Sequence, residues 1–192
     1  MGTSLARLLD SAYPGPTADF PDATFRVLSS GDLADEAADI GSQLTLSLYL
    51  YRVTVNDHLR NVRITNAPEA SPPLSLNLHY LMSAWSPSSD DEHTVFGWAM
   101  RHLHQNPILD GSRLMPDGGW NNDEVIHIVP DELTNEDLFR IWDSFGQNYR
   151  LSTSYIARVV VLEPDEIAVS ERVIATRFQL DGEPQPALGE EA

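Results

Sequence analysis

Hydrophobic and polar residues alternate most regularly between Gln43 and Val55. Leucines occupy every second position from 44 to 50, which is the period of two of a pleated strand. The opposite face carries Thr45, Ser47, Tyr49 and Tyr51. Because this second face is aromatic rather than charged, we expect it to be covered too, by the same chain or by a neighbour.

Shorter stretches of the same character predict a sheet of five or six strands. From position 74 to 80, leucines again alternate with polar residues before the run ends at a tyrosine. The full set of expected strands is Ala23–Leu28, Gln43–Val55, Leu74–Tyr80, Glu124–Val129, Ser152–Glu163 and Arg172–Leu180.

Apolar residues at helical spacing predict two principal helices. The first begins at Asp90 or Asp91 and runs to about Gln105, because Pro107 stops it. Its expected buried stripe is Val95, Phe96, Ala99, Met100 and Leu103.

The second helix begins at Thr134, which with Asp137 resembles a capping box, and Gly146 suits its C-terminal cap. Its apolar positions are Leu138, Ile141, Trp142 and Phe145, and a shorter helix is expected over Leu5–Ala12. These elements predict one α+β domain with a mixed, mostly antiparallel sheet and two principal helices packed on it.

Composition narrows the class of partner. The 192 residues suffice for one domain with a sizeable core, and 42% are hydrophobic. Twelve basic residues, all of them arginine, face 29 acidic ones, for a formal charge of −17. Such a surface repels phosphate, so we expect neither nucleic acid nor an anionic membrane as partner.

Other sequence features concern the compartment and the available chemistry. The chain has no cysteine, which excludes disulfides and thiolate chemistry. The first twelve residues lack the apolar region of a secretory signal, and no run reaches the roughly 20 apolar residues that cross a bilayer. A cytoplasmic location is the expectation.

Histidines and carboxylates give no convincing active site. His102 and His104 lie two apart on a helix, about 200° around its axis, so they cannot share an ion. His79 and His127 lie in strands, and we interpret them as structural. Asp90, Asp91 and Glu92 begin a helix, where its dipole stabilises carboxylates. Nucleophile, phosphate and dinucleotide motifs are missing. We therefore expect no enzyme, no cofactor and no metal, although a small enzyme using histidine and carboxylates remains an alternative.

Aromatic residues suggest contact surfaces. Trp85 and Trp120 fall in or beside expected loops, Tyr49 and Tyr51 share a strand face, and Trp98 lies off the stripe of its helix. Together they favour a protein that buries surface against copies of itself or a partner.

Four stretches carry a family resemblance: 48–61 (LYLYRVTVNDHLRN), 73–85 (PLSLNLHYLMSAW), 96–109 (FGWAMRHLHQNPIL) and 133–163 (LTNEDLFRIWDSFGQNYRLSTSYIARVVVLE). In this order they resemble the family that includes the cap proteins of extracellular contractile injection systems, such as the Photorhabdus virulence cassettes and the antifeeding prophage.

The resemblance implies a fold similar to phage tail terminators and a structural role. A cap of this kind forms a hexameric ring that contacts the inner tube protein and the sheath protein, ends both, and fixes particle length. The resemblance brings no cofactor and no catalytic residue. A generic cytosolic adaptor unrelated to injection machines is the stronger alternative to this function.

The expected organisation is a cap domain over residues 1–180, followed by an acidic, flexible tail over 181–192. The tail holds four acids, two prolines and no base. It either solubilises the chain or adds a strand to an exposed edge of the sheath.

Overall fold

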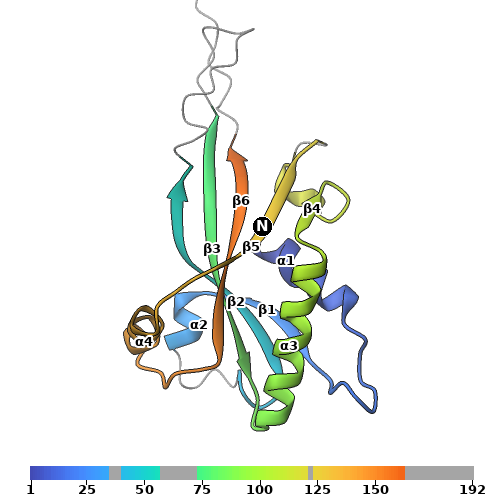
Figure 1. Cartoon of the computed structure of the whole chain (residues 1–192), viewed down its shortest axis with the longest axis vertical. Helices are drawn as coiled ribbons and strands as arrows, with labels where there is room; N and C mark the ends of the chain where they lie inside the picture. Colours follow the sequence, from blue (N-terminus) through green and yellow to red (C-terminus); the bar gives the residue numbers. More distant parts are fainter. Residues whose placement is uncertain (35–39, 57–72, 121–122, 163–192) are drawn as a thin grey trace, which may run out of the picture.

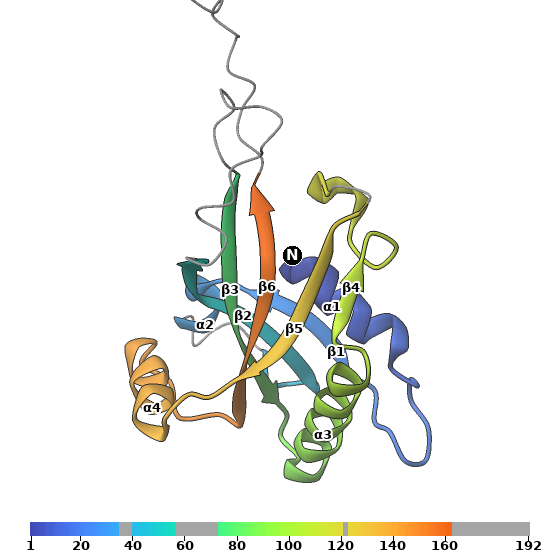
Figure 2. The ribbon, with the colours of Figure 1, turned by 45° about the horizontal axis from the view of Figure 1, so that its top comes forward.

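A six-stranded sheet forms the centre of the computed structural model, which describes residues 1–34, 40–56, 73–120 and 123–162 (Figures 1 and 2). The strand order is β1-β2-β3-β6-β5-β4. The strands are β1 (Thr24–Leu28), β2 (Thr45–Val55), β3 (Leu74–Trp85), β4 (Ile108–Asp110), β5 (Val125–Asp131) and β6 (Ser152–Leu162). The helices are α1 (Gly2–Ala12), α2 (Ser30–Ala34), α3 (Ser89–Gln105), the 3-10 turn η1 (Pro116–Gly118) and α4 (Asn135–Ser144). The predicted α+β class is confirmed.

Pairing in the sheet is antiparallel except at one edge. β1 runs parallel to β2, while β2, β3, β6, β5 and β4 pair antiparallel in turn. β2, β3 and β6 are the longest strands and lie side by side at the centre. The mixed, mostly antiparallel sheet is therefore as the sequence predicts.

One face of the sheet packs against α1 and α3. The first core comprises α1 residues Leu5 and Leu9, sheet residues Leu46, Leu48, Met82, Ile126 and Ile128, and α3 residues Val95, Ala99 and Leu103, among others. Leu5, Leu9, Met82 and Val95 have no exposed surface. These are the alternate positions of the strands and one side of each helix, as a two-layer arrangement requires.

The other face packs against α2 and α4. Its smaller core joins Leu28, Leu33, Ile40, Leu81, Trp85, Leu138 and Trp142. Tyr49 and Tyr51 are partly buried against it, and the ring of Tyr49 meets that of Phe145 edge-on at 5.3 Å. The aromatic face of β2 is thus covered by the chain itself.

Helix boundaries follow the predicted signals with one change. Thr134 caps α4 by accepting a hydrogen bond from the Asp137 backbone at 3.1 Å, and Gly146 has a φ of 67°, so both predictions are confirmed. The cap of α3 is Ser88, not Asp90 or Asp91, because its hydroxyl accepts from the Asp91 backbone.

The predicted stripe of α3 is wrong at two positions. Met100 is 41% exposed, whereas Trp98 is only 8% exposed. The reason is a long-range contact: Tyr13 and Phe25 lie on this side of the helix, with ring centroids 4.9 and 5.9 Å from that of Trp98. The other predicted positions, Val95, Phe96, Ala99 and Leu103, are buried as expected, so the buried side of the helix differs only by Trp98 in place of Met100.

Some elements of the structure were not predicted from the sequence, and some predictions concern residues outside the described ranges. The sequence patterns do not predict α2, β4 and η1, and the expected strand Leu74–Tyr80 is five residues shorter than β3 at its C-terminal end. The predicted strand Arg172–Leu180, the domain boundary at 180 and the tail 181–192 lie outside the described residues. Within the described residues, no helix is long and apolar enough to cross a membrane.

Candidate interaction surface

The three central strands continue past the helices as an extension that we call the distal arm. It consists of residues 50–55 of β2, 74–80 of β3 and 156–162 of β6. Figure 1 shows the upper ends of these strands rising beyond α3 and α4. The arm stays ordered as a sheet because β3 pairs with a neighbour on each side along it.

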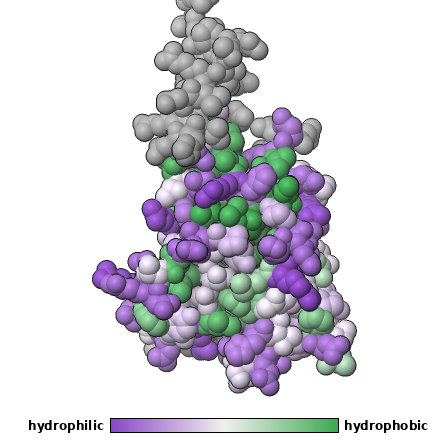
Figure 3. Space-filling view, in the orientation of Figure 1, coloured by the Kyte–Doolittle hydropathy of each residue, from purple (hydrophilic) through white to green (hydrophobic). Residues whose placement is uncertain are grey.

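One face of the distal arm is apolar. The register places Val53 opposite Leu78, Val55 opposite Leu76, and Leu74 opposite Leu162. Cross-strand partners point to the same side of a sheet, and Leu78 packs against the first core, so this face continues that core. Val53 and Leu162 are 50% exposed, Val55 47% and Leu74 45%. Figure 3 shows hydrophobic surface gathered over the upper strand ends.

The opposite face of the arm is polar and hydrogen-bonded. His79 Nδ1 lies 3.0 Å from Asp131 Oδ2, and His79 Nε2 lies 3.1 Å from Thr54 Oγ1. The Tyr51 hydroxyl donates to the same carboxylate oxygen at 3.1 Å. Ser154 Oγ is 2.9 Å from that hydroxyl. This network ties β2, β3, β5 and β6 together at the base of the arm.

A carboxylate, an imidazole and a hydroxyl are hydrogen-bonded in the same order as in the catalytic triad of hydrolases. Here, however, the three groups lie within the sheet and do not present a nucleophile to a substrate. A carboxylate only accepts hydrogen bonds, so Nδ1 of His79 donates, and in the neutral ring Nε2 accepts from Thr54. Thr54 lies within a continuous strand rather than on a sharp turn that would present it to a substrate. His79 is 8% exposed, and its ring meets that of Tyr51 edge-on. The interpretation of His79 as a satisfied structural histidine fits this geometry.

Charge separates the arm from the rest of the described chain. The described arm carries the exposed Arg52 and Arg158 and contains no Asp or Glu. From the β5 side, Asp131 binds His79, and Glu124 Oε1 accepts from the Val161 backbone at 3.4 Å. In a protein of net charge −17, an acid-free element with two arginines is distinctive.

The outer edge of β2 is open along the arm. β1 ends at Leu28, opposite Tyr49, so from Leu50 to Val55 no described strand pairs with this edge. An open edge offers backbone donors and acceptors to another strand. The arm therefore combines an apolar face, two arginines and an open edge.

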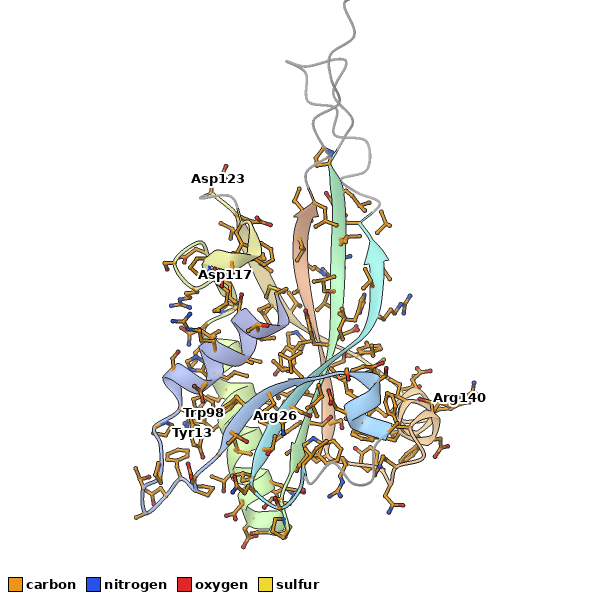
Figure 4. The ribbon with its side chains drawn as sticks, turned by 180° about the vertical axis from the view of Figure 1, so that it is seen from behind. Tyr13, Arg26, Trp98, Asp117, Asp123 and Arg140 are labelled. Atoms are coloured by element: carbon orange, nitrogen blue, oxygen red, sulfur yellow. The ribbon has the colours of Figure 1, made fainter. Side chains whose placement is uncertain are left out.

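The tryptophans expected at the surface are mostly buried. Trp85 is 4% exposed, meets Trp142 edge-on at 5.5 Å, and donates its indole N–H to Ser47 at 2.7 Å. Trp120 is partly buried against the first core. Figure 4 shows Trp98 beside Tyr13. Phe139 and Tyr149 are the exposed aromatic residues, at 51% and 46%. The exposed apolar surface of the arm is aliphatic, and the leucine alternation at 74, 76 and 78, together with Val53 and Val55, is the sequence signal that could have located it.

His102 is the histidine with a clear electrostatic environment. Its ring stacks on Trp98 with centroids 5.1 Å apart and planes 13° from parallel. Burial, and secondarily the charge of Arg113, lowers the pKa of His102. Its buried Nε2 has no hydrogen-bond partner within the described chain. No group of three or more metal-ligating side chains occurs in the same residues.

We expect His102 to make stability depend on pH. The unfolded state takes up a proton near the ordinary pKa of 6.5, but the folded state resists it. The free energy of unfolding should therefore be unaffected above this pH and fall below it. Urea unfolding of wild type and His102→Gln between about pH 7.5 and about 5.5 checks this. The wild type should lose more stability than the variant, and equal losses would contradict the assignment.

Comparisons with known proteins agree with this architecture. The chain matches the family model described as the Pvc16 N-terminal domain over residues 1–176. Its fold is similar to the sheath/tube terminator, in the extended state, of an extracellular contractile injection system, PVC. The TM-score is 0.54 and the identity 18%, over 91% of this chain and 62% of that one.

A second solved structure gives the same result. The tube-terminating cap of the anti-feeding prophage has a TM-score of 0.54 and 17% identity, over 93% of this chain and 59% of that one. The chain thus spans about three-fifths of the length of both terminators. No curated protein matches the sequence.

Together, these observations define a single α+β domain with the fold of tube terminators. The chain belongs to the Pvc16 N-terminal domain family. The resemblance inferred from the four sequence stretches is confirmed.

Proposed function

We propose that this chain is the cap, or tail terminator, of a phage-tail-like contractile injection system. In this role it ends the inner tube and the sheath, fixes particle length, and makes or breaks no bond. The observation that carries the proposal is family membership over residues 1–176, together with a fold matched over nine-tenths of the chain by terminators of two such machines.

The terminator works as a closed ring. Head-to-tail contacts between identical subunits either close into a ring or continue as a filament. A hexamer closes such contacts, so one face binds the end of the tube and the other recruits no further subunits. Growth of the tube then stops without any chemical step.

The tube protein and the sheath protein are the partners of this ring, which assembles in the cytoplasm. The strongly acidic surface, with net charge −17, disfavours nucleic acid and anionic membranes as alternatives. Residues 181–192 form an acidic tail after a cap domain ending at 180. Its four acids and two prolines suit either an extended segment bound at a sheath edge or a solubilising tail.

Arrest of tube growth tests the proposal. Purified chain is added to polymerising tube subunits of the same particle, and tube lengths are measured by negative-stain microscopy. Mean length should fall as the concentration of the chain rises, with extra density at one end of each tube. An unrelated acidic protein of similar size and charge is the control for non-specific repulsion.

The adaptor alternative predicts a different result. An adaptor unrelated to injection machines leaves tube length unchanged and places no density at the tube end. That outcome would refute the terminator function.

A further inference from the structure

We propose that the outer side of α4 binds the polar face of the distal arm of a neighbouring copy of this chain. In this contact Arg52 of the neighbouring copy lies over the rings of Phe139 and Tyr149 and pairs with Asp143. The inference rests on the proposed function, because it assigns the contact that closes the terminator ring. It goes beyond that function by naming the residues on both sides of the contact.

Two exposed aromatic rings lie against each other beside the outer side of α4. Phe139, on the helix, and Tyr149, in the segment before β6, are each about half exposed. Their ring centroids are 5.2 Å apart and their planes meet at 66°. Figure 4 shows Arg140, the residue after Phe139, extending from α4 away from the sheet. Because each ring restricts the other, a partner that covers the pair orders few additional side chains.

Carboxylates lie one helical turn away on both sides of Phe139. Asp143 follows it by four residues and Glu136 precedes it by three, so both lie on the same side of α4. Glu136 binds Arg140 at 2.6 Å, whereas the Asp143 carboxylate has no partner within the described chain. We call Glu136, Phe139, Asp143 and Tyr149 the α4 patch. A partner that covers the rings also covers Asp143, and a buried carboxylate without a counter-charge is costly, so the partner must bring a cation.

The chain already contains one arginine held between a ring and a carboxylate. The guanidinium carbon of Arg150 lies 5.1 Å from the ring centroid of Trp85, and its Nη1 lies 3.9 Å from Glu92 Oε1. The α4 patch offers the same two kinds of group, but among the described residues no arginine stacks on its rings. A planar guanidinium suits this combination, because it stacks on rings and pairs with carboxylates at the same time.

The polar face of the distal arm supplies such arginines. Arg52 is the cross-strand partner of His79, which belongs to the polar network, so Arg52 lies on the polar face. Arg158 is the partner of His127, whose two neighbours along β5 enter the first core, so Arg158 lies on the polar face too. Both arginines are exposed, and neither binds a carboxylate within the described chain. Asp131, which reaches this face from β5, already binds His79.

Arg52 is the more accessible of the two arginines to a neighbouring helix. It lies on β2, whose outer edge pairs with no described strand between Leu50 and Val55. Arg158 lies on β6, which is flanked by β3 and β5. We therefore assign Arg52 to the rings and to Asp143, while Arg158 adds attraction at longer range.

Charge complementarity within one sequence identifies a second copy as the occupant. A head-to-tail ring needs two different and complementary surfaces on each subunit. The arm offers arginines and, in its described residues, no Asp or Glu, whereas the α4 patch offers rings and carboxylates. Figure 1 shows the arm rising beyond the level of α4, so these are separate places on one subunit. Two arms in contact would oppose arginine to arginine, and two α4 patches would oppose acid to acid.

Charge reversal with rescue tests the contact in sedimentation experiments. Asp143→Arg should raise the dissociation constant for self-association about tenfold or more, because arginine then faces arginine. Arg52→Glu should raise it to a similar extent, because an acid then faces Asp143. The double variant restores opposite charges and should associate within about threefold of the wild type. A double variant that associates no more tightly than the single variants, or a wild type that is monomeric at every concentration, would overturn the inference.

Asp10→Arg is the matched control for Asp143→Arg. Asp10 and Asp143 are exposed acids in the last turns of α1 and α4, and neither side chain has a partner in the described chain. Each reversal removes an acid from a helix C-terminus, where the dipole favours cations, so both variants should fold as the wild type does. Both change the net charge equally, but Asp10→Arg should change the dissociation constant less than about twofold. Equal effects of the two reversals would contradict the assignment.

Photo-crosslinking identifies what lies on the α4 patch. Because the chain has no cysteine, Asn148→Cys places a single thiol beside Tyr149, to which a benzophenone maleimide is attached. The labelled chain is irradiated alone, and again with tube subunits and sheath subunits present. The expected product in both cases is two chains joined, with the second chain attached within residues 50–55 of β2.

Ser11→Cys, at an exposed position of α1, is the control for labelling. It should yield at most about a tenth of the crosslinked dimer, because its label faces no neighbouring copy in this arrangement. Equal yields from the two positions, or an Asn148→Cys product joined to a tube or sheath subunit, would refute the proposed contact.

Failure of this inference is distinguishable from failure of the proposed function. A chain that stops tube growth but crosslinks from position 148 to a tube subunit retains the terminator function and loses the assigned contact. A chain that crosslinks to the arm of a second copy but leaves tube growth unchanged retains the contact and loses the function.

Discussion

Replacing Trp142 by alanine is expected to lower the free energy of unfolding by about 3–5 kcal/mol, the largest loss for a single side chain of the second core. Trp142 is 1% exposed. Its ring meets that of Trp85 at 5.5 Å and that of Phe145 at 6.3 Å, both edge-on. Its indole N–H donates to Ser152 Oγ at 3.2 Å. The substitution removes these contacts and leaves a cavity between α4 and the sheet.

The size of the effect follows from the small size of this core. α4 has ten residues, too few for an isolated helix to be stable in water, so packing holds it in place. Leu138 and Trp142 are its two buried side chains. Without Trp142, α4 should detach locally and expose Trp85, which would change tryptophan fluorescence as well as the urea midpoint.

Two control variants separate the contribution of buried packing from those of the hydrogen bond and of any substitution on the helix. Phe139→Ala lies on the same helix at a position that is 51% exposed, and should cost about 1 kcal/mol or less. Trp142→Phe retains most of the packing but loses the hydrogen bond to Ser152, and should cost about 1–2 kcal/mol. If Trp142→Ala lost no more stability than Phe139→Ala, the described packing of α4 on the sheet would be wrong.

Period-two alternation predicts strands well only where the two faces differ. In β2, leucines on one face and polar or aromatic residues on the other made the pattern visible. β3 was ended too early because both of its faces are buried after Tyr80. Met82 and Ala84 enter the first core, while Leu81 and Trp85 enter the second. A strand buried on both faces has no alternation to detect.

The side on which a helix is buried depends on more than its own spacing. Periodicity predicted an apolar stripe on α3, but Tyr13 and Phe25, about 70 to 85 positions away along the chain, determine that Trp98 is buried and Met100 is not. β4 and α2, with three and five residues, are too short for any periodicity to register. The error on α3 thus comes from long-range contacts, and the failure to predict β4 and α2 comes from the shortness of these elements.

The candidate surface was predictable in part. The acid-free, apolar character of residues 50–55, 74–80 and 156–162 can be read from the sequence. Their assembly into one face depends on the register, which includes irregularities between Leu50 and Arg52 and between Leu76 and Leu78. A slip of one residue would move the valines and leucines to the polar face. The surface could therefore be located only once the register was known from the structure.

The second large effect concerns the particle rather than the chain. In producing cells that lack this protein, tubes should grow without a fixed end, so that their lengths vary broadly instead of clustering at one value. Complementation with wild type should restore uniform length.

The length distribution of purified particles, imaged by electron microscopy with and without this chain, tests the central claim most directly. The terminator account predicts a narrow distribution with the chain and a broad one, with many overlong tubes, without it. Particles of normal and uniform length in the absence of the chain would contradict the account.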